Sequence, residues 1–265
     1  AKERVQGNDT AIIDYPNVRR QLSLCKSWVE GMRGLLYTTA KCIDDSETHP
    51  DEAMRKRAQN RADLLTPICK AYCSDTGFRI TEKALQVFGG YGYISEYPME
   101  QYLRDVKIAS IYEGTNGIQA LDLVGRKLSI NNGELFREYY EEVSAFVTKH
   151  EEHEELKDEM ASLRGAANTI GQVAMKFAEW GMGGQQTKVM LGATAFLEMM
   201  GHALCAHVLV EQAVIAAEKL KTSKDVFYSN KIKTAKFFVA QVLPQVKMCA
   251  KGILSGDETA MEIEF

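Results

Sequence analysis

The sequence predicts an all-α protein, and three observations lead to that prediction. Apolar residues recur at helical spacing along several long segments, which is the pattern of amphipathic helices. Only five of the 265 residues are proline, and none lies between Met99 and Leu243. That stretch is rich in Ala, Leu, Glu, Lys and Met, which favour helix. No segment alternates convincingly as a strand does, so we expect helices joined by glycine-containing breaks.

The first half of the chain is expected to form two long helices and two short ones. The long helices span about 16–45 and 51–88, and their short connection predicts antiparallel neighbours. Pro67 lies inside the second helix and is expected to kink it. After glycine-containing breaks, the short helices should span about 98–108 and 115–128.

The polar run Asn131–Gly133 is the clearest internal boundary. The Glu-rich segment 134–160 beyond it is interpreted as a solvated helix face. Three more long helical stretches are expected, at about 160–180, 187–221 and 224–254. We therefore divide the chain into two units, residues 1–130 and residues 131–265.

Composition excludes several classes of protein. With 32 Lys and Arg against 36 Asp and Glu, the net charge is −4, which argues against a nucleic-acid partner. No apolar run approaches the roughly 18 residues that span a membrane, and no signal peptide is visible, so we expect no membrane association. Six cysteines do not form a disulfide scaffold in a chain of this size. The chain begins with Ala1 inside a charged segment, as a piece of a longer protein would.

The cysteines and histidines suggest no metal site. Cys69 and Cys73 are four residues apart, but both fit the apolar stripe of their helix and have no CxxC or histidine partner. His202, Cys205 and His207 have a spacing that does not place both histidines on one helix face. We interpret all five as core or helix-surface residues.

Glu113 lies in a break between two helices, just before Thr115, a good N-cap residue. The amides after Thr115 form a ready site for an anion or a carbonyl. Aromatic and apolar neighbours would partly desolvate a carboxylate here, and desolvation raises a carboxyl pKa by up to about 3 units or more. A raised pKa suits a general base near neutral pH. From composition alone, a surface glutamate is the simpler reading, and both remain open.

Four separated segments resemble the C-terminal helical domain of the acyl-CoA dehydrogenase family, in the order and spacing of that family. They are ERVQG (3–7), QVFGGYGY (86–93), EYP with the later RD pair (96–105) and IYEGTNGIQ (111–119). The resemblance covers about residues 1–130. Residues 131–265 resemble the extra module of larger members. Together, the two resemblances imply an all-α fold: an acyl-CoA dehydrogenase C-terminal-type helical bundle followed by an additional antiparallel helical module.

The resemblance implies FAD-dependent α,β-dehydrogenation of an acyl-CoA thioester, as in fatty acid β-oxidation. Glu113 matches the catalytic base that abstracts the α-proton while flavin N5 accepts the β-hydride. Tyr112 and Gly114 match substrate-binding positions, and the Glu113 amide matches a donor to the thioester oxygen.

The FAD contacts of the family fall on two groups of residues here. Thr115, Asn116 and Gly117 match positions that hold the flavin of the same subunit, although the family often has glutamine where Gly117 stands. The second group matches contacts to the FAD of a neighbouring subunit: Arg4 and Gln6 for the pyrophosphate, and Gln86, Val87, Phe88, Gly89 and Gly90 for the adenosine.

The resemblance also implies partners and a location. It implies an acyl-CoA substrate, a homodimer or homotetramer with FAD sites shared across subunits, and an electron-accepting protein such as an electron-transfer flavoprotein. We expect the cytoplasm of a bacterium, with the mitochondrial matrix as the alternative. The domains that precede this region in family members hold much of the site, so we expect the fragment alone to be inactive. Two alternatives stay open: a non-catalytic helical oligomerisation or interaction module, and an acyl-CoA oxidase.

Overall fold

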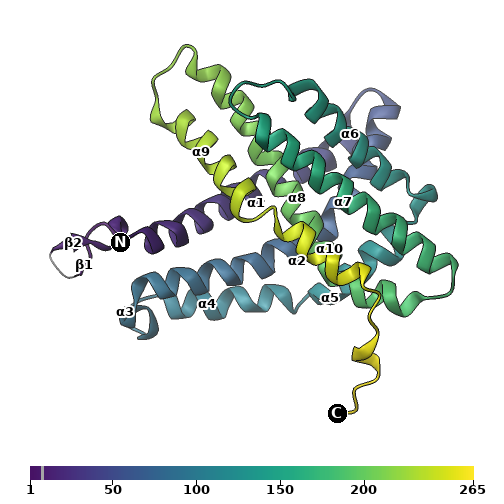
Figure 1. Ribbon diagram of the computed structural model, residues 1–265, viewed down its shortest axis with the longest axis horizontal. Helices are drawn as coiled ribbons and strands as arrows, with labels where there is room; N and C mark the ends of the chain where they lie inside the picture. Colours follow the sequence, from purple (N-terminus) through teal and green to yellow (C-terminus); the bar gives the residue numbers. More distant parts are fainter. Residues whose placement is uncertain (7–8) are drawn as a thin grey trace.

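The computed structural model describes residues 1–6 and 9–265, and in these residues the chain is almost entirely helical (Figure 1). The all-α prediction is confirmed. A two-residue hairpin near the N-terminus is the exception, with β1 (Val5–Gln6) antiparallel to β2 (Thr10–Ala11). The helices are α1 (Pro16–Thr48), α2 (Glu52–Phe88), α3 (Gly90–Tyr93), α4 (Met99–Lys107), α5 (Asn116–Asp122), α6 (Glu134–His150), α7 (Lys157–Met182), α8 (Gln186–Leu220), α9 (Val226–Gln241) and α10 (Gln245–Leu254).

The two longest helices of the first half, α1 and α2, pack side by side along much of their length. Asp51 caps α2, because its side chain accepts hydrogen bonds from the amides of Ala53 at 2.8 Å and Met54 at 3.3 Å. The expected helix pair is therefore present. α2 runs from Glu52 to Phe88 as one element, with Pro67 buried inside it.

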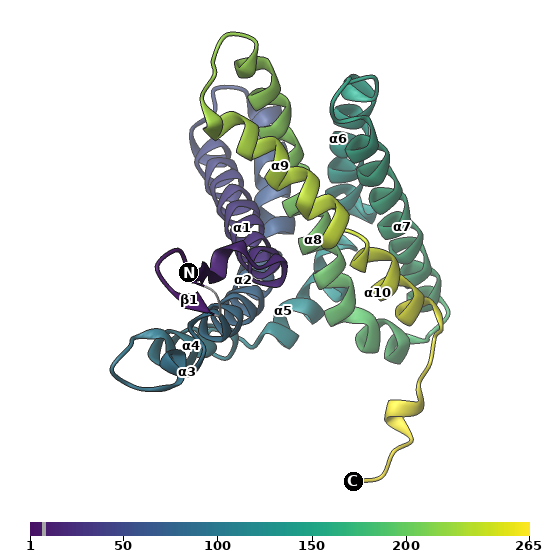
Figure 2. The same cartoon turned by 60° about the vertical axis from the view of Figure 1, so that its left-hand side comes forward.

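α8 is the central helix of the bundle. It contacts α1, α2 and α5 from the first half of the sequence and α7, α9 and α10 from the second half. Figure 2 shows α1 and α2 at one side of the molecule, α6 and α7 at the other, and α8 between them. One hydrophobic cluster runs through both halves of the sequence, from Leu35 and Ile68 to Phe196 and Phe238.

α8 also corrects the expectation that no segment is apolar enough to span a membrane. Among the described residues it alone passes that test by length and composition. However, 72% of its apolar window is buried inside the protein, as in the core helix of a soluble bundle.

Three element boundaries differ from the sequence-based expectations, and local chemistry explains one directly. The expected helix over 224–254 is divided into α9 and α10, and Pro244 stands at the start of α10, where its missing N–H costs nothing. α5 ends at Asp122 and passes into a π-helical turn, Leu123–Lys127. Part of the Glu-rich run forms the connection between α6 and α7 and is not a helix face.

Candidate functional site

The loop before α5 contains two successive residues in the left-handed region of backbone conformation. Glu113 has φ of +55° and Gly114 has φ of +78°. Glycine adopts this conformation freely, but a glutamate there is strained by about 1–3 kcal/mol. Such strain persists only where the surroundings hold the backbone, and it occurs often at functional sites.

Side chains from α2 hold this loop. The Lys70 ammonium donates to the Gly114 carbonyl at 2.7 Å and to Asn116 Oδ1 at 2.8 Å. Asn116 is buried, and its Nδ2 donates to the Ala71 carbonyl at 3.2 Å and to Ser74 Oγ at 2.9 Å. The first turn of α5 is therefore fixed against the middle of α2.

Residues of α5 also contact the loop. Thr115 accepts a hydrogen bond from the Ile118 amide at 3.4 Å, which confirms it as the N-cap of α5. Gln119 Nε2 donates to the Glu113 carbonyl at 3.4 Å. The carbonyl groups of both left-handed residues are thus engaged by side chains.

Glu113 is exposed, and so is its neighbour Tyr112. The expected desolvation of Glu113 by aromatic and apolar residues is therefore not produced by the described residues of this chain. Gly114 and Gly117 are exposed as well. The loop presents an open face on which another chain segment or a ligand can lie.

The second group of sequence-predicted residues meets at the far end of α2. Arg4 Nη1 donates to the carbonyls of Val87 at 3.2 Å and Phe88 at 2.6 Å, residues that are 83 and 84 positions away. Gly89, with φ of +60°, ends α2, and a Cβ there would lie 2.8 Å from the Arg4 guanidinium. The positive φ favours glycine at 89, and a side chain there would also displace the Arg4 guanidinium.

The remaining predicted residues of this group lie in or beside α2, α3 and β1. Gln86 is in the last turn of α2 and its carbonyl accepts from the Gly89 amide at 3.0 Å. Gly90 begins α3, with no atom within 4 Å of where a Cβ would stand. Gln6 lies in β1, but its side chain is outside what the structure describes, as is Gly7 of the same segment.

The two groups are well separated. Lys70, beneath the Glu113 loop, and Phe88, beside Arg4, are 18 residues apart on α2. At 1.5 Å of rise per residue, the separation is roughly 27 Å. The structure joins each group internally but does not bring Arg4 to Glu113.

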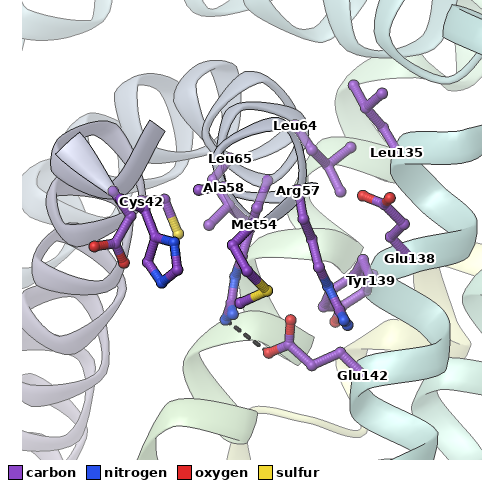
Figure 3. Close-up of a pocket in the computed structure, with 13 residues that line it drawn as sticks. Cys42, Met54, Arg57, Ala58, Leu64, Leu65, Leu135, Glu138, Tyr139 and Glu142 are labelled. Carbon is purple, nitrogen blue, oxygen red and sulfur yellow. Dashed lines mark ion pairs between the residues drawn. The ribbon is translucent and has the colours of Figure 1, made fainter. Parts of the chain in front are cut away.

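A pocket of about 290 Å³ lies between α1, α2 and α6, away from both groups (Figure 3). Leu64, Leu65 and Leu135 are buried in its wall, and Arg61 pairs with Glu142 at 2.8 Å. Burial raises the Glu142 pKa, which the arginine opposes. Acidic and basic side chains both line the pocket, so its electrostatics favour neither an anionic nor a cationic ligand.

The two histidines of α8 face different helices. His202 Nδ1 lies 2.8 Å from the Tyr72 hydroxyl of α2, and His207 packs on Phe146 of α6 with ring centroids 4.9 Å apart. Burial lowers the pKa of each to about 4, so both are neutral near pH 7. Within residues 1–6 and 9–265, no three His, Cys, Asp or Glu side chains gather as a metal site would require.

Sequence reasoning missed Lys70, Ser74 and Gln119. Lys70 and Ser74 reach the loop and the start of α5 only through the fold, since Lys70 is 44 positions from Gly114 and Ser74 is 42 positions from Asn116. Gln119 is six positions from Glu113, so its contact is local. One signal was present in the sequence. Lys70 is the one charged residue in the otherwise apolar segment 67–73, and a charged side chain that is partly buried there requires polar partners.

Comparison with known proteins gives two family matches that together cover most of the chain. The model of "Acyl-CoA dehydrogenase, C-terminal domain" matches residues 1–128. The model of "Acetyl-CoA dehydrogenase C-terminal like" matches residues 139–264.

Similar curated proteins include a butyryl-CoA dehydrogenase of Syntrophomonas wolfei, 34% identical over 263 residues, which are 97% of this chain and 43% of that protein. A broad-specificity linear acyl-CoA dehydrogenase of Mycobacterium tuberculosis is 32% identical over 285 residues, covering 100% of this chain and 47% of its own length. The chain thus spans less than half the length of these relatives.

Among solved structures, an acyl-CoA dehydrogenase from Bacillus anthracis complexed with FAD has a similar fold, with a TM-score of 0.76 and 19% identity. The match covers 97% of this chain and 45% of that one. At 19% sequence identity, this similarity supports a shared fold and no more.

Proposed function

We propose that this chain, which belongs to the acyl-CoA dehydrogenase family, carries the proton-abstracting base for the α,β-dehydrogenation of an acyl-CoA thioester. The observation that supports this most strongly is the loop at Glu113. Its carboxylate is exposed on a backbone held in the left-handed region, with the carbonyl groups of residues 113 and 114 both engaged.

Glu113 acts as the general base in this proposal. A thioester α-proton is weakly acidic, so its removal needs a base positioned at the α-carbon and a donor at the carbonyl oxygen, where negative charge develops. Among the hydrogen bonds of the described residues, none uses the Glu113 amide. That amide is therefore free to donate to the thioester oxygen, and Gly114, without a side chain, lets the thioester approach.

The residues proposed for FAD fit the group. Arg4 is exposed and, among the described residues, donates only through Nη1, which leaves its other donors for a pyrophosphate. Gly90 leaves open space beside it, and the Phe88 ring is partly exposed for stacking. Thr115, Asn116 and Gly117 would hold the flavin near the base. Bound FAD would supply the hydride acceptor.

The separation of the two groups supports an oligomer. About 27 Å along α2 divides Arg4 from the Glu113 loop. We infer that each FAD site combines Glu113 of one copy with Arg4 of another, in a homodimer or homotetramer. Acyl-CoA is the proposed substrate, and an electron-transfer flavoprotein the proposed acceptor. The named relatives act on butyryl-CoA or on linear acyl-CoA.

Replacing Glu113 in the full-length protein that contains this chain tests the proposal. With Glu113→Gln, we expect anaerobic bleaching of the flavin by acyl-CoA to slow by about 10²- to 10⁴-fold, because the general base is lost. Rapid-mixing absorbance measures the rate, and Glu141→Gln, an exposed change on α6, is the matched control. Bleaching of the Glu113→Gln protein at the parent rate would show that Glu113 is not the base.

A further inference from the structure

Lys70, in the middle of α2, makes its hydrogen bonds to the Glu113 loop. We propose that Lys70 is a positioning residue, which holds the loop so that the Glu113 carboxylate points in the productive direction. This rests on the proposed function, because positioning matters to catalysis only if Glu113 is the base.

The contacts of Lys70 are unusual for a helix lysine. It is half-buried, and no carboxylate of the described residues lies within ion-pair distance of its ammonium. An ammonium has three donors and no acceptor, and two of these donors reach Gly114 O at 2.7 Å and Asn116 Oδ1 at 2.8 Å. Its hydrogen bonds are thus directed to the loop and to the first residue of α5.

These contacts fix the backbone on one side of Glu113. Lys70 holds the carbonyl of Gly114, and Gln119 holds the carbonyl of Glu113 at 3.4 Å. The peptide plane that directly follows the Glu113 Cα and the plane after it are therefore both held, which restricts the direction of the Glu113 Cα–Cβ bond from that side. Asn116 is itself fixed by Ser74 and Ala71, so its amide oxygen offers Lys70 a rigid partner.

Removing the Lys70 donors should release the loop. A glutamate with φ of +55° keeps that conformation only while its surroundings hold it, so the loop would relax and the carboxylate would move. A misplacement of about 1 Å can lower a rate by about 10²-fold. Substrate binding elsewhere would be unchanged, so the loss should appear in kcat and not in KM.

The test uses Lys70→Met in the full-length holoenzyme, with Lys83→Met on the same helix as the matched control. We expect kcat to fall about 10- to 100-fold with KM within about threefold of the parent. Lys70→Arg, which keeps a cationic donor, should recover most of the loss. A Lys70→Met enzyme with parental kcat, or a Lys83→Met enzyme with the same loss, would overturn the proposal.

Hydrogen exchange of the peptide over residues 111–119 gives a readout independent of activity. Faster amide exchange in Lys70→Met, with an unchanged melting temperature, supports the proposal, and parental exchange overturns it. Lys70→Gln serves in the same way if Lys70→Met does not fold. The Glu113→Gln variant separates the two proposals. If its flavin bleaches at the parent rate, Glu113 is not the base, but amide exchange over residues 111–119 in Lys70→Met still decides whether Lys70 holds the loop.

Discussion

Gly201 on α8 sets how closely α8 approaches α2. A Cβ built on this glycine would lie 2.1 Å from Cδ2 of the buried Tyr72 ring, which is inside van der Waals contact. The ring cannot move away freely, because its hydroxyl contacts His202 Nδ1 at 2.8 Å. A side chain at 201 must therefore separate the helices or displace the ring.

We expect Gly201→Ala to lower the free energy of unfolding by about 1–3 kcal/mol or more, because overpacking outweighs the higher helix propensity of alanine. Gly165→Ala on α7 is the control, since no atom lies within 4 Å of its added methyl. It should raise stability by about 0.5–1 kcal/mol. Urea denaturation measures both variants, and equal effects of the two would contradict this account of Gly201.

At the same scale, the sequence could predict residues whose chemistry is local. Thr115 is an N-cap residue because a helical segment begins directly after it, and the structure confirms it. Lys70 could not be assigned to the loop, because only the packing of α2 on α5 brings it to Gly114. For Glu113 the sequence left a surface glutamate and a desolvated base both open, and it could not decide between them, since burial depends on chain segments that lie elsewhere.

At the scale of helices, polar contacts join α2 to α8, buried at Tyr72 and His202 and partly exposed at Arg79 and Glu198. Tyr72 contacts His202, and Arg79 pairs with Glu198 one turn away. His202 Nε2 lies 3.7 Å from Glu198, while burial and Arg79 both lower the His202 pKa, to about 4. The neutral imidazole is therefore the form that the folded protein accommodates.

This predicts acid sensitivity of the fold. The His202 pKa is lower in the folded chain than its ordinary 6.5, so the unfolded chain binds more protons between pH 6.5 and 4. The stabilisation is complete above pH 6.5 and is lost as the pH falls towards 4, on the order of 1–3 kcal/mol. Urea unfolding across this range should show a shallower pH slope for His202→Gln than for the parent. His153→Gln, outside the helices, is the control, and an unchanged slope for His202→Gln would refute the prediction.

The presence of each long helix could be predicted from the spacing of its apolar residues. The positions of the helix ends depend on individual residues and local geometry, which that spacing does not report. α1 and α2 were expected because each has a continuous apolar stripe. The division between α9 and α10 could have been read from Pro244, which cannot donate a helical hydrogen bond. The π-helical turn after α5 carries no comparable residue signal.

At the scale of the whole molecule, α8 makes the two halves of the sequence share a core. Phe196 and Leu209 of α8 belong to the same buried cluster as Leu35 and Ile68. At Gly34 of α1, an added Cβ would lie 2.3 Å from Val208, so the helices from the two halves approach closely. A boundary near residue 130, which the sequence suggested, thus divides the chain without dividing its hydrophobic core.

We therefore predict that residues 1–130 alone do not form the native bundle. Removing residues 131–265 removes α8 and exposes the faces of α1 and α2 that contact it, around Gly31, Gly34 and Tyr72. Exposed apolar area costs about 25 cal/mol per Å², and a domain is stable by only about 5–15 kcal/mol. The truncated chain should bind a hydrophobic dye and melt without cooperativity, whereas residues 1–265 should melt in one cooperative transition by circular dichroism. A cooperative melt of residues 1–130 at the temperature of the longer chain would show instead that the first unit is stable without α8.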